Sequence, residues 1–381
     1  MFHRLASYVA KLLSALRKGW LFAWRRFKKY WGKNVWHKIV VVVCCVLLLS
    51  LGTMYGIARW YIWSQRNTPL TLGATFVPDY AQSLGVDPQQ TFEALINDLH
   101  IKQFRLVSYW SDMEPTKGHY DFSQLDWEMK DAEAAHVKIT LTVGLRQPRW
   151  PECHMPTWAE NEPESEWQPQ LQAFMTAVVN RYKNSPSLGA WQVENEYFLQ
   201  GFGDCTNFSR QRLADETDLV KKLDPKHTLI VGRSNNDLGI PLGQPQPDEF
   251  SVSIYKRVWD AGVTHRYLEY PFPAWYYAFL AGVQKIVTGK NMVIGELQAE
   301  AWPPNGQGIT DTSLAEQNKS MDAQMLANRF KYGEATGMKT IDLWGAEYWY
   351  YRLVKLHDPS LWNVAKQAYA QPQTCVQTKK S

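Results

Sequence analysis

Eight short apolar segments, separated by stretches with helical period, dominate residues 70–370 of this 381-residue chain. Segments of this length are typical of buried strands, and apolar residues three and four positions apart are typical of covering helices. Eight strands alternating with helices over about 300 residues favour a closed α/β fold, the (β/α)8 TIM barrel. The predicted strands are 72–77, 102–109, 137–144, 188–196, 227–234, 249–255, 291–297 and 340–349.

The segments between the predicted strands carry helix start signals. Asp87 precedes Pro88, as an N-cap precedes a first helical residue. The segment "DFSQ" at Asp121 resembles a capping box. Residues 235–248 have no helical period, so we expect the fifth helix to be short or missing. An open doubly wound sheet is the alternative, but the sequence contains no G-x-G-x-x-G segment after the first strand and no phosphate-binding loop.

An uncharged run of 19 residues, Ile39–Ile57, precedes the predicted barrel. About 20 apolar residues span a bilayer core as a helix. A cleaved signal peptide is the alternative, but its apolar region is shorter, about 7–15 residues, and a small-residue cleavage site follows it. We therefore predict a transmembrane helix at 39–58. Ten Lys and Arg residues come before Ile39, which predicts a cytoplasmic N-terminus, a single pass through the plasma membrane and an extracytoplasmic barrel.

The basic N-terminal segment, 1–38, has an apolar stripe at spacings of three and four. This pattern predicts a helix that lies on an anionic membrane surface, although an ordinary basic flank that only fixes topology would share its charge. After the span we expect a linker at 59–70, the barrel at 71–370 and a polar tail at 371–381. The stripe consists of Leu13, Leu16, Trp20, Trp24, Phe27 and Trp31.

Charge is divided unevenly along the chain. Residues 1–67 hold 12 of the 41 Lys and Arg residues and no acidic residue, which leaves 29 bases against 37 acids in the rest. An acidic body is a poor partner for nucleic acid, because phosphates need a basic face. We therefore expect a lipid bilayer, contacted through 39–58, and a saccharide as partners, and no nucleic acid.

The cysteines indicate a disulfide and no metal site. Cys44 and Cys45 lie in the predicted span, and no cysteine pair has metal-ligand spacing or forms C-x-x-C, so we expect no metal and no cofactor. Cys153 and Cys205 fall in the loops after the third and fourth strands, which are neighbours in a barrel. An oxidising compartment would allow them to form a disulfide. Cys375, in the polar tail, is expected to stay unpaired.

Polar and aromatic side chains gather where the predicted strands end, which is where TIM barrels place their active sites. Two carboxylates from different strands, among indoles and arginines, suit glycosidic bond cleavage, which needs one acid and one carboxylate beside the reacting sugar. Each tryptophan alone would more often be a core-packing residue, and it is their position at the same strand ends that indicates a site. The residues at the strand ends are Arg105, Trp110, Arg146, Trp150, Asn195, Glu196, Arg233, Asn235, Tyr255, Glu296 and Trp344.

Two motifs carry a resemblance to a known group of enzymes. The segment "WQVENEYF" (191–198) resembles the strand-four motif of the β-galactosidases of glycoside hydrolase families 35 and 42, and 109–127 resembles the segment after strand two of the same enzymes. The chain thus resembles the retaining barrel glycosidases of clan GH-A, which also include the cellulase-like family 5. This implies a retaining glycoside hydrolase that cleaves β-glycosidic bonds of extracellular or cell-wall glycan by double displacement, anchored here by the predicted span.

The resemblance also implies roles for single residues. Glu196 would be the acid/base and Glu296 the nucleophile. Asn195 would bind the 2-hydroxyl of the reacting sugar, Arg105 and Tyr255 would hold the nucleophile, and Trp344 would form the floor of the subsite. We expect Trp110, Trp150 and Asn235 to contact substrate as well.

The strand-seven segment "VIGELQAEAW" (293–302) departs from the pattern, because it matches neither the galactosidases nor, closely, family 5. The sugar is therefore not implied. Glu300 lies in the loop, where we expect it to bind a distal sugar or an arginine. Glu194 is expected to lie deeper, paired with Arg105 or Arg146. A transglycosylase with the same residues and an inactive glycan-binding barrel remain alternatives.

Overall fold

The computed structural model describes residues 14, 17–22, 24–26, 28–29, 31, 34–199, 201–205, 208–233 and 245–370. They form two compact units, Met1–Gly56 and Ile57–Ser381.

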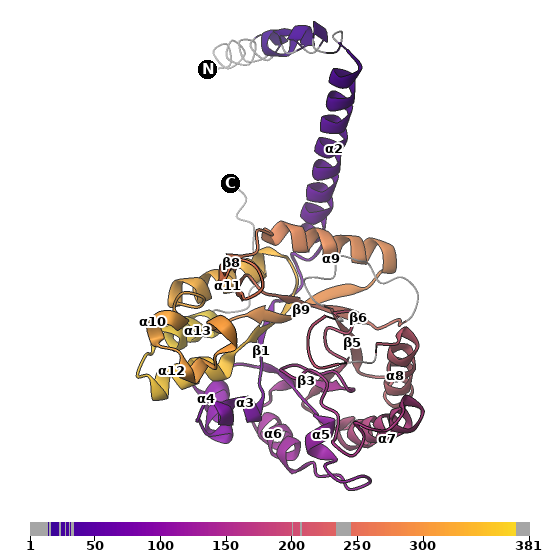
Figure 1. Ribbon diagram of the computed structural model, residues 1–381, viewed down its shortest axis with the longest axis vertical. Helices are drawn as coiled ribbons and strands as arrows, with labels where there is room; N and C mark the ends of the chain where they lie inside the picture. The colour runs from indigo at the N-terminus through magenta and orange to yellow at the C-terminus, as the bar shows by residue number, and fades with distance from the viewer. Residues whose placement is uncertain are drawn as a thin grey trace. The chain divides into compact units, whose positions relative to one another are not determined.

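The second unit is built on a closed barrel of eight parallel strands, with helices around it (Figure 1). Neighbouring strands follow the order β1-β10-β9-β6-β5-β4-β3-β2. The predicted TIM barrel is therefore confirmed. The strands are β1 (Thr71–Thr75), β2 (Gln103–Leu106), β3 (Lys138–Val143), β4 (Leu188–Val193), β5 (Thr228–Arg233), β6 (Glu249–Ile254), β9 (Asn291–Gln298) and β10 (Thr340–Trp344).

Helices fill most of the connections between these strands. They are α3 (Pro78–Ser83), α4 (Pro88–Asn97), α5 (Trp110–Met113), α6 (Ser123–Ala134), α7 (Glu164–Tyr182), α8 (Arg210–Leu223), α9 (Ala274–Thr288), α10 (Leu314–Gln317), α11 (Ala323–Ala335), α12 (Ala346–Lys355) and α13 (Ser360–Ala370), with 3-10 turns at Pro304–Gly306 and Ile309–Asp311. The Asp87 carboxylate caps α4 by accepting from the Gln90 backbone N–H at 2.8 Å. No capping box forms at α6, which begins after Phe122; Asp121 instead accepts from the Ser123 N–H at 2.9 Å.

The core lies between the strands and the covering helices. Phe92 of α4 shows how an apolar helix face docks: its ring lies 4.8 Å from that of Phe76 and 4.9 Å from that of Phe104 in β2. All three side chains are fully buried. Burial of aromatic surface of this size dominates the stability of such an interface.

The connection between β5 and β6 has no helix in its described part, 245–248; residues 234–244 lie outside the described residues. Directly after β6 comes an antiparallel hairpin of β7 (Arg257–Asp260) and β8 (Arg266–Glu269). The Asp260 carboxylate fixes its turn by accepting from the Thr264 N–H at 2.7 Å and from its hydroxyl at 2.6 Å.

Helix α2 (Val35–Ser64) contains the predicted span and extends beyond it, with a mean hydropathy of 2.4 over its most apolar window. Ala58 and Tyr61 are buried in the barrel unit. They lie beside α9, where a side chain at Gly282 would approach Cγ2 of Ile57 to 2.7 Å. The segment expected to be a linker at 59–70 is therefore helical as far as Ser64.

The described residues of the basic segment are helical from 17 to 31, with Trp20 and Trp24 stacked at 5.7 Å. Leu13, Leu16 and Phe27 of the predicted stripe, and Cys375 of the tail, lie outside the described residues.

Candidate active site

Two large cavities open at the carboxyl ends of the strands in the part of the chain that the structure describes. The smaller one, about 550 Å³, is lined by three glutamates that the sequence singled out, Glu196, Glu296 and Glu300. The larger one, about 850 Å³, lies over the loops that follow β1, β2 and β3. Tyr80, Arg149 and Trp150 line both.

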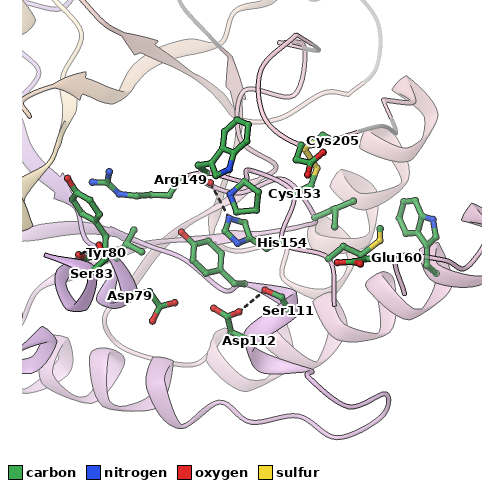
Figure 2. A pocket seen from close by; sticks show the side chains of 18 of the residues that line it. Asp79, Tyr80, Ser83, Ser111, Asp112, Arg149, Cys153, His154, Glu160 and Cys205 are labelled. Atoms are coloured by element: carbon green, nitrogen blue, oxygen red, sulfur yellow. Dashed lines mark hydrogen bonds between the residues drawn. A yellow bond between two sulfur atoms is a disulfide. The ribbon is translucent and has the colours of Figure 1, made fainter. Parts of the chain in front are cut away.

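The larger cavity is acidic (Figure 2). Asp79 and Asp112 point toward one another, and burial together with the charge of Asp112 raises the pKa of Asp79 to about 6. The ring of His154 stacks on Tyr109 at 3.5 Å, and burial lowers the pKa of this histidine to about 4. At neutral pH His154 therefore adds no positive charge to the cavity.

A disulfide joins Cys153 and Cys205 at the edge of the larger cavity. The two Cα atoms are 5.4 Å apart, within the range that a disulfide requires. The predicted pairing is thus confirmed, and it ties the loop after β3 to the loop after β4.

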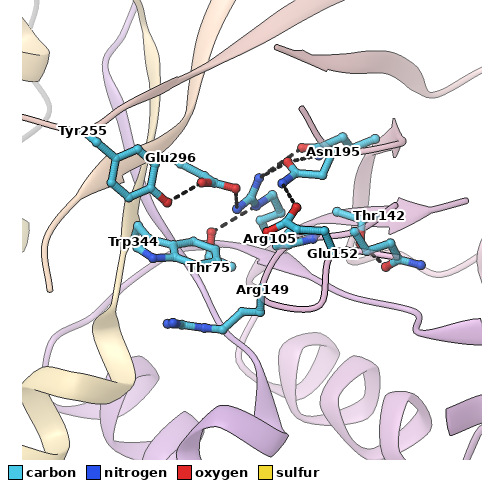
Figure 3. A network of polar contacts seen from close by, with 12 residues as sticks. Thr75, Arg105, Thr142, Arg149, Glu152, Asn195, Tyr255, Glu296 and Trp344 are labelled. Carbon is cyan, nitrogen blue, oxygen red and sulfur yellow. Dashed lines mark hydrogen bonds and ion pairs between the residues drawn. The ribbon is translucent and has the colours of Figure 1, made fainter. Parts of the chain in front are cut away.

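In the smaller cavity, Glu296 is held at both carboxylate oxygens (Figure 3). Arg105 donates from Nη2 to Oε1 at 2.8 Å, and the Tyr255 hydroxyl donates to Oε2 at 2.6 Å. These are the two residues to which the resemblance assigns this contact. The Glu296 side chain is only 3% exposed, so the guanidinium supplies the charge partner that a buried carboxylate needs.

A β-bulge directs Glu296 into the barrel. Val252 of β6 pairs with Ile294, but Ser253 pairs with Glu296, so Gly295 is an extra residue in β9. A bulge re-aims the side chain that follows it. A Cβ at Gly295 would lie 3.0 Å from Cβ of Ser251, so the close approach of the two strands favours glycine here.

Arg105 also connects Glu296 to the end of β4. Its Nη1 donates to Oδ1 of Asn195 at 3.4 Å, and its Nε donates to the Thr75 hydroxyl at 3.0 Å. With 1% of its surface exposed, Arg105 acts as a fixed support and leaves the cavity surface to the groups it orients.

The chain leaves β4 through an unusual backbone. Glu194 and Glu196 both adopt positive φ, 57° and 43°. Such conformations are strained for residues other than glycine and concentrate at functional sites. Gly232 of β5 makes room for this turn, since a Cβ there would lie 3.1 Å from the Glu196 backbone nitrogen. The turn brings Glu196 to the wall of the smaller cavity, 5% exposed.

Glu194 is buried, as expected, but its charge partner is a different one. Its Oε1 lies 3.1 Å from Nη1 of Arg212 in α8, and its carboxylate accepts from the backbone N–H groups of Leu145 and Arg146 at 2.7 and 3.0 Å. The expected pairing with the side chain of Arg105 or Arg146 is wrong, because the side chain points outward toward α8. Glu194 therefore fixes the loop after β3.

Glu300 binds an arginine at the end of the smaller cavity. Arg149 donates to its two oxygens at 2.9 and 3.0 Å, and Tyr80 donates at 2.8 Å. The indole nitrogen of Trp344 donates to Glu300 at 2.8 Å, and the Arg149 guanidinium lies 4.2 Å from the centroid of this indole. This wall separates the two cavities and sets the plane of Trp344.

The remaining predicted site residues differ in their exposure to the cavities. Trp150 is 68% exposed at the junction of the two cavities. Trp110 is fully buried and donates its indole N–H to Glu114 at 2.6 Å, so the expectation that it contacts substrate is corrected: it packs behind the cavity wall. Arg233 is buried at the end of β5. Asn235 lies outside the described residues.

Sequence reasoning missed several residues that line the smaller cavity. Trp259, on the β7–β8 hairpin, gave no signal because the hairpin was not predicted, whereas Trp302, two residues beyond Glu300, could have been found from its position. Glu152 was also missed. Burial, together with the charges of Glu196 and Glu296, raises its pKa well above the usual range.

No group of three or more His, Cys, Asp or Glu residues suited to a metal ion occurs within the described part of the chain.

Known proteins that are similar in sequence to parts of this chain are mannan endo-1,4-β-mannosidases. Mannan endo-1,4-β-mannosidase F of Aspergillus fumigatus is 24% identical over 212 residues, which cover 51% of this chain and 48% of that protein. Mannan endo-1,4-β-mannosidase A of Emericella nidulans is 31% identical over 111 residues, 29% of this chain and 27% of that protein. The chain thus spans about half, or less, of the length of these relatives. No protein-family model matches the sequence.

Solved structures share the fold at low sequence identity. A family 42 β-galactosidase of G. stearothermophilus has a TM-score of 0.55 and 13% identity, covering 82% of this chain and 58% of that one. An exo-β-1,4-mannosidase from Opitutaceae bacterium strain TAV5 has a TM-score of 0.53 and 15% identity, covering 80% and 60%. A xylanase of Thermotoga maritima has a TM-score of 0.51 and 15% identity, covering 81% and 96%. Part of the chain is therefore similar in sequence to mannan endo-1,4-β-mannosidases, and its barrel shares the fold of a β-galactosidase, an exo-β-1,4-mannosidase and a xylanase.

Proposed function

We propose that this chain is a retaining β-glycosidase with Glu296 as nucleophile and Glu196 as acid/base. The observation that carries the proposal is the double support of Glu296 by Arg105 and Tyr255 in a cavity that Glu196 also lines. Two carboxyl groups from different strands, one of them rigidly held, are what double displacement at an anomeric carbon requires.

The reaction has two steps. In the first, Glu296 attacks the anomeric carbon and forms a glycosyl ester, while Glu196 gives its proton to the departing glycosidic oxygen. In the second, Glu196 takes a proton from water, and the resulting hydroxide displaces Glu296 with restored configuration. Burial and the neighbouring charges of Glu296 and Glu196 raise the pKa of Tyr255 well above its usual range, so its hydroxyl stays a hydrogen-bond donor throughout.

The sugar would be held by residues around this pair. Trp344 would stack on its apolar face, and Asn195 would bind its 2-hydroxyl. Trp150 and Trp302 are aromatic surfaces for the neighbouring sugars. Glu300, paired with Arg149, would act mainly by fixing Trp344.

A β-1,4-linked mannan or a similar hexose polymer is the substrate class that we propose. The support is the sequence similarity to mannan endo-1,4-β-mannosidases, one of which matches about half of this chain. The exo-β-1,4-mannosidase among the solved structures shares only the fold.

We further propose that residues 39–58 anchor the protein in the plasma membrane with the barrel outside the cell. The support is the length and hydropathy of α2, the ten basic residues before it, and a disulfide that suits an oxidising compartment. An antibody on intact cells should recognise an epitope added after Ser381, whereas an epitope before Met1 should need permeabilised cells. The reverse pattern would contradict this orientation.

Activity is tested with the full-length chain in detergent on aryl β-glycosides and on manno-, cello- and xylo-oligosaccharides. We expect hydrolysis that is strongest on the manno series. Binding without turnover would favour a glycan-binding barrel, and products longer than the substrate would favour transglycosylation. Inertness without binding would refute the proposal.

A further inference from the structure

We propose that Glu152 is a substrate-binding residue that determines specificity. Its carboxyl accepts a hydrogen bond from a hydroxyl of the reacting sugar, and this hydroxyl is the neighbour of the hydroxyl that Asn195 binds. The inference rests on the proposed function and adds a third carboxyl to the site. Glu152 lines the same cavity as Glu196 and Glu296, although it comes from the loop after β3 (Figure 3).

The backbone of Glu152 is fixed in one conformation by its neighbours in the loop. The residue has a φ of 72°, in the left-handed region, and its N–H and C=O bond to Arg149 and Gln147 of the same loop at 2.7 and 2.8 Å. Cys153, the next residue, is in the disulfide with Cys205. Strain that surrounding structure maintains in this way is typical of functional sites.

The side chain is confined from the outer side as well. A Cβ at Gly203 would lie 2.7 Å from Cβ of Glu152, so the loop after β4 closes over the Glu152 stem. Only 4% of the residue is exposed. Glu152 lines the smaller cavity, so the side chain is open on that side.

The contacts of the carboxyl are incomplete. Its Oε2 accepts from Nδ2 of Asn195 at 3.4 Å and lies 3.6 Å from Nη2 of Arg146. Within the described part of the chain its Oε1 makes no hydrogen bond. A buried carboxyl that lacks close partners is unfavourable, and a sugar hydroxyl at this place would supply the missing hydrogen bond.

A purely structural ion pair with Arg146 is the competing explanation, and the geometry disfavours it. The distance of 3.6 Å exceeds hydrogen-bond range. The Arg146 guanidinium is held instead by the backbone carbonyls of Asn195 and Phe202, both at 2.8 Å. Burial, together with the charges of Glu196 and Glu296, raises the pKa of Glu152, so a third carboxyl at this place is unfavourable, and a structural role alone would not require it.

The contact with Asn195 identifies the part of the sugar concerned. If Asn195 binds the 2-hydroxyl, a carboxyl in contact with its amide lies at the spacing of the neighbouring ring hydroxyl, that on C3. The substrate class is then a β-glycoside whose hydroxyls on C2 and C3 are both free. An alkyl or acyl group on the 3-oxygen would remove the donor and add bulk against a wall fixed by the disulfide.

The test compares Glu152→Ala and Glu152→Gln with the wild-type full chain in detergent, on 4-nitrophenyl β-mannoside and its 3-deoxy analogue. Glu160→Gln, on the far side of the larger cavity, is the matched control. For the mannoside we expect kcat/KM to fall about 10- to 100-fold in the Ala variant, as the cost of leaving a buried sugar hydroxyl without its partner predicts, and less in the Gln variant. For the 3-deoxy analogue the Ala variant should lose less than about 3-fold, because the contacted group is already absent.

An equal loss on both substrates would overturn the inference and indicate a structural role for Glu152. Unchanged kinetics in Glu152→Ala would also overturn it, by showing that Glu152 does not bind the sugar. Binding of mannotetraose to Glu296→Ala, with and without Glu152→Ala, separates this result from failure of the proposed function. Weaker binding in the double variant supports the inference even if the wild type does not hydrolyse the mannoside. Equal binding overturns it, and so does absence of binding in both.

Discussion

The hydroxyl of Tyr255 lies 2.6 Å from Oε2 of Glu296, opposite the guanidinium of Arg105 at Oε1. Both oxygens of this carboxylate are therefore fixed by donors that come from β2 and from the end of β6. A nucleophile works best when its support leaves it one orientation. Glu300, the second candidate on this segment, has donors of its own in Arg149 and Tyr80, but it lies two residues beyond Gln298, where β9 ends.

Replacing Glu296 with Ala should abolish turnover, because it removes the nucleophile of the proposed double displacement. Added azide or formate should restore part of the activity with inverted product, since the small anion enters the space of the lost carboxylate. Product configuration is measured by NMR. Glu300→Ala is the matched variant; if it abolished turnover while Glu296→Ala did not, the nucleophile would be Glu300.

Removing only the hydroxyl that orients Glu296 should have a graded effect. In Tyr255→Phe we expect kcat to fall about 10- to 100-fold, the value for one hydrogen bond to a charged group, with little change in KM. Tyr120→Phe, remote from the cavity, should behave as wild type. A loss confined to KM would contradict the orienting role and indicate direct contact with substrate.

The wild-type enzyme should retain configuration at the anomeric carbon. Retention requires the carboxyl groups of Glu196 and Glu296 to stand about 5–5.5 Å apart, whereas inversion requires about 6.5–9.5 Å. NMR of the first-formed product and a crystal structure with bound saccharide check the two halves of this prediction independently. An inverted first product would exclude double displacement.

The barrel could be predicted because its signals are local. Each strand is a short apolar run, and each helix start depends on residues within four positions, as Asp87 and Gln90 show. Glu296 could be predicted for a related reason: it follows the apolar run of β9 directly, and strand ends meet at one face of a barrel.

Other parts of the site depend on contacts between distant segments. Trp110 and Trp150 look alike in sequence, but α5 turns Trp110 into the core while the loop after β3 exposes Trp150. Glu152 lies 43 residues from Asn195 in the chain, and the pairing of β3 with β4 brings the loops that carry them together. Glu194 and Glu196 are two positions apart, and in a regular strand their side chains would lie on the same face. The positive φ of both residues breaks the strand geometry, so the two side chains point to different places.

Loss of the disulfide should lower activity while the overall fold of the barrel stays intact. In Cys153→Ser with Cys205→Ser, the loop that carries Trp150 and Glu152 loses its covalent tie, so we expect kcat/KM to fall at least about 10-fold by loss of positioning. The disulfide lies in loops outside the barrel core, so far-UV circular dichroism should be unchanged. Cys44→Ser is the control. Unchanged kinetics in the double variant would show that hydrogen bonds alone hold the loop.

The stability of the barrel should depend on pH through Asp342. Burial raises the pKa of this β10 carboxyl to about 7, while Arg105 and Gln103 act in the opposite direction. In the unfolded chain the carboxyl ionises near its ordinary pKa of about 3.9. Between these two values the folded state keeps a proton that the unfolded state has lost. The contribution of Asp342 to the free energy of unfolding is therefore fully present below about pH 4 and falls by about 1.4 kcal/mol per pH unit until the pH passes the folded pKa.

Asp342→Asn should flatten this decline. The measurement is the free energy of unfolding of the full chain in detergent between pH 4.5 and about 7.5, and the control is Asp218→Asn on the exposed surface of α8. Parallel curves for the two variants would show that Asp342 does not hold the proton.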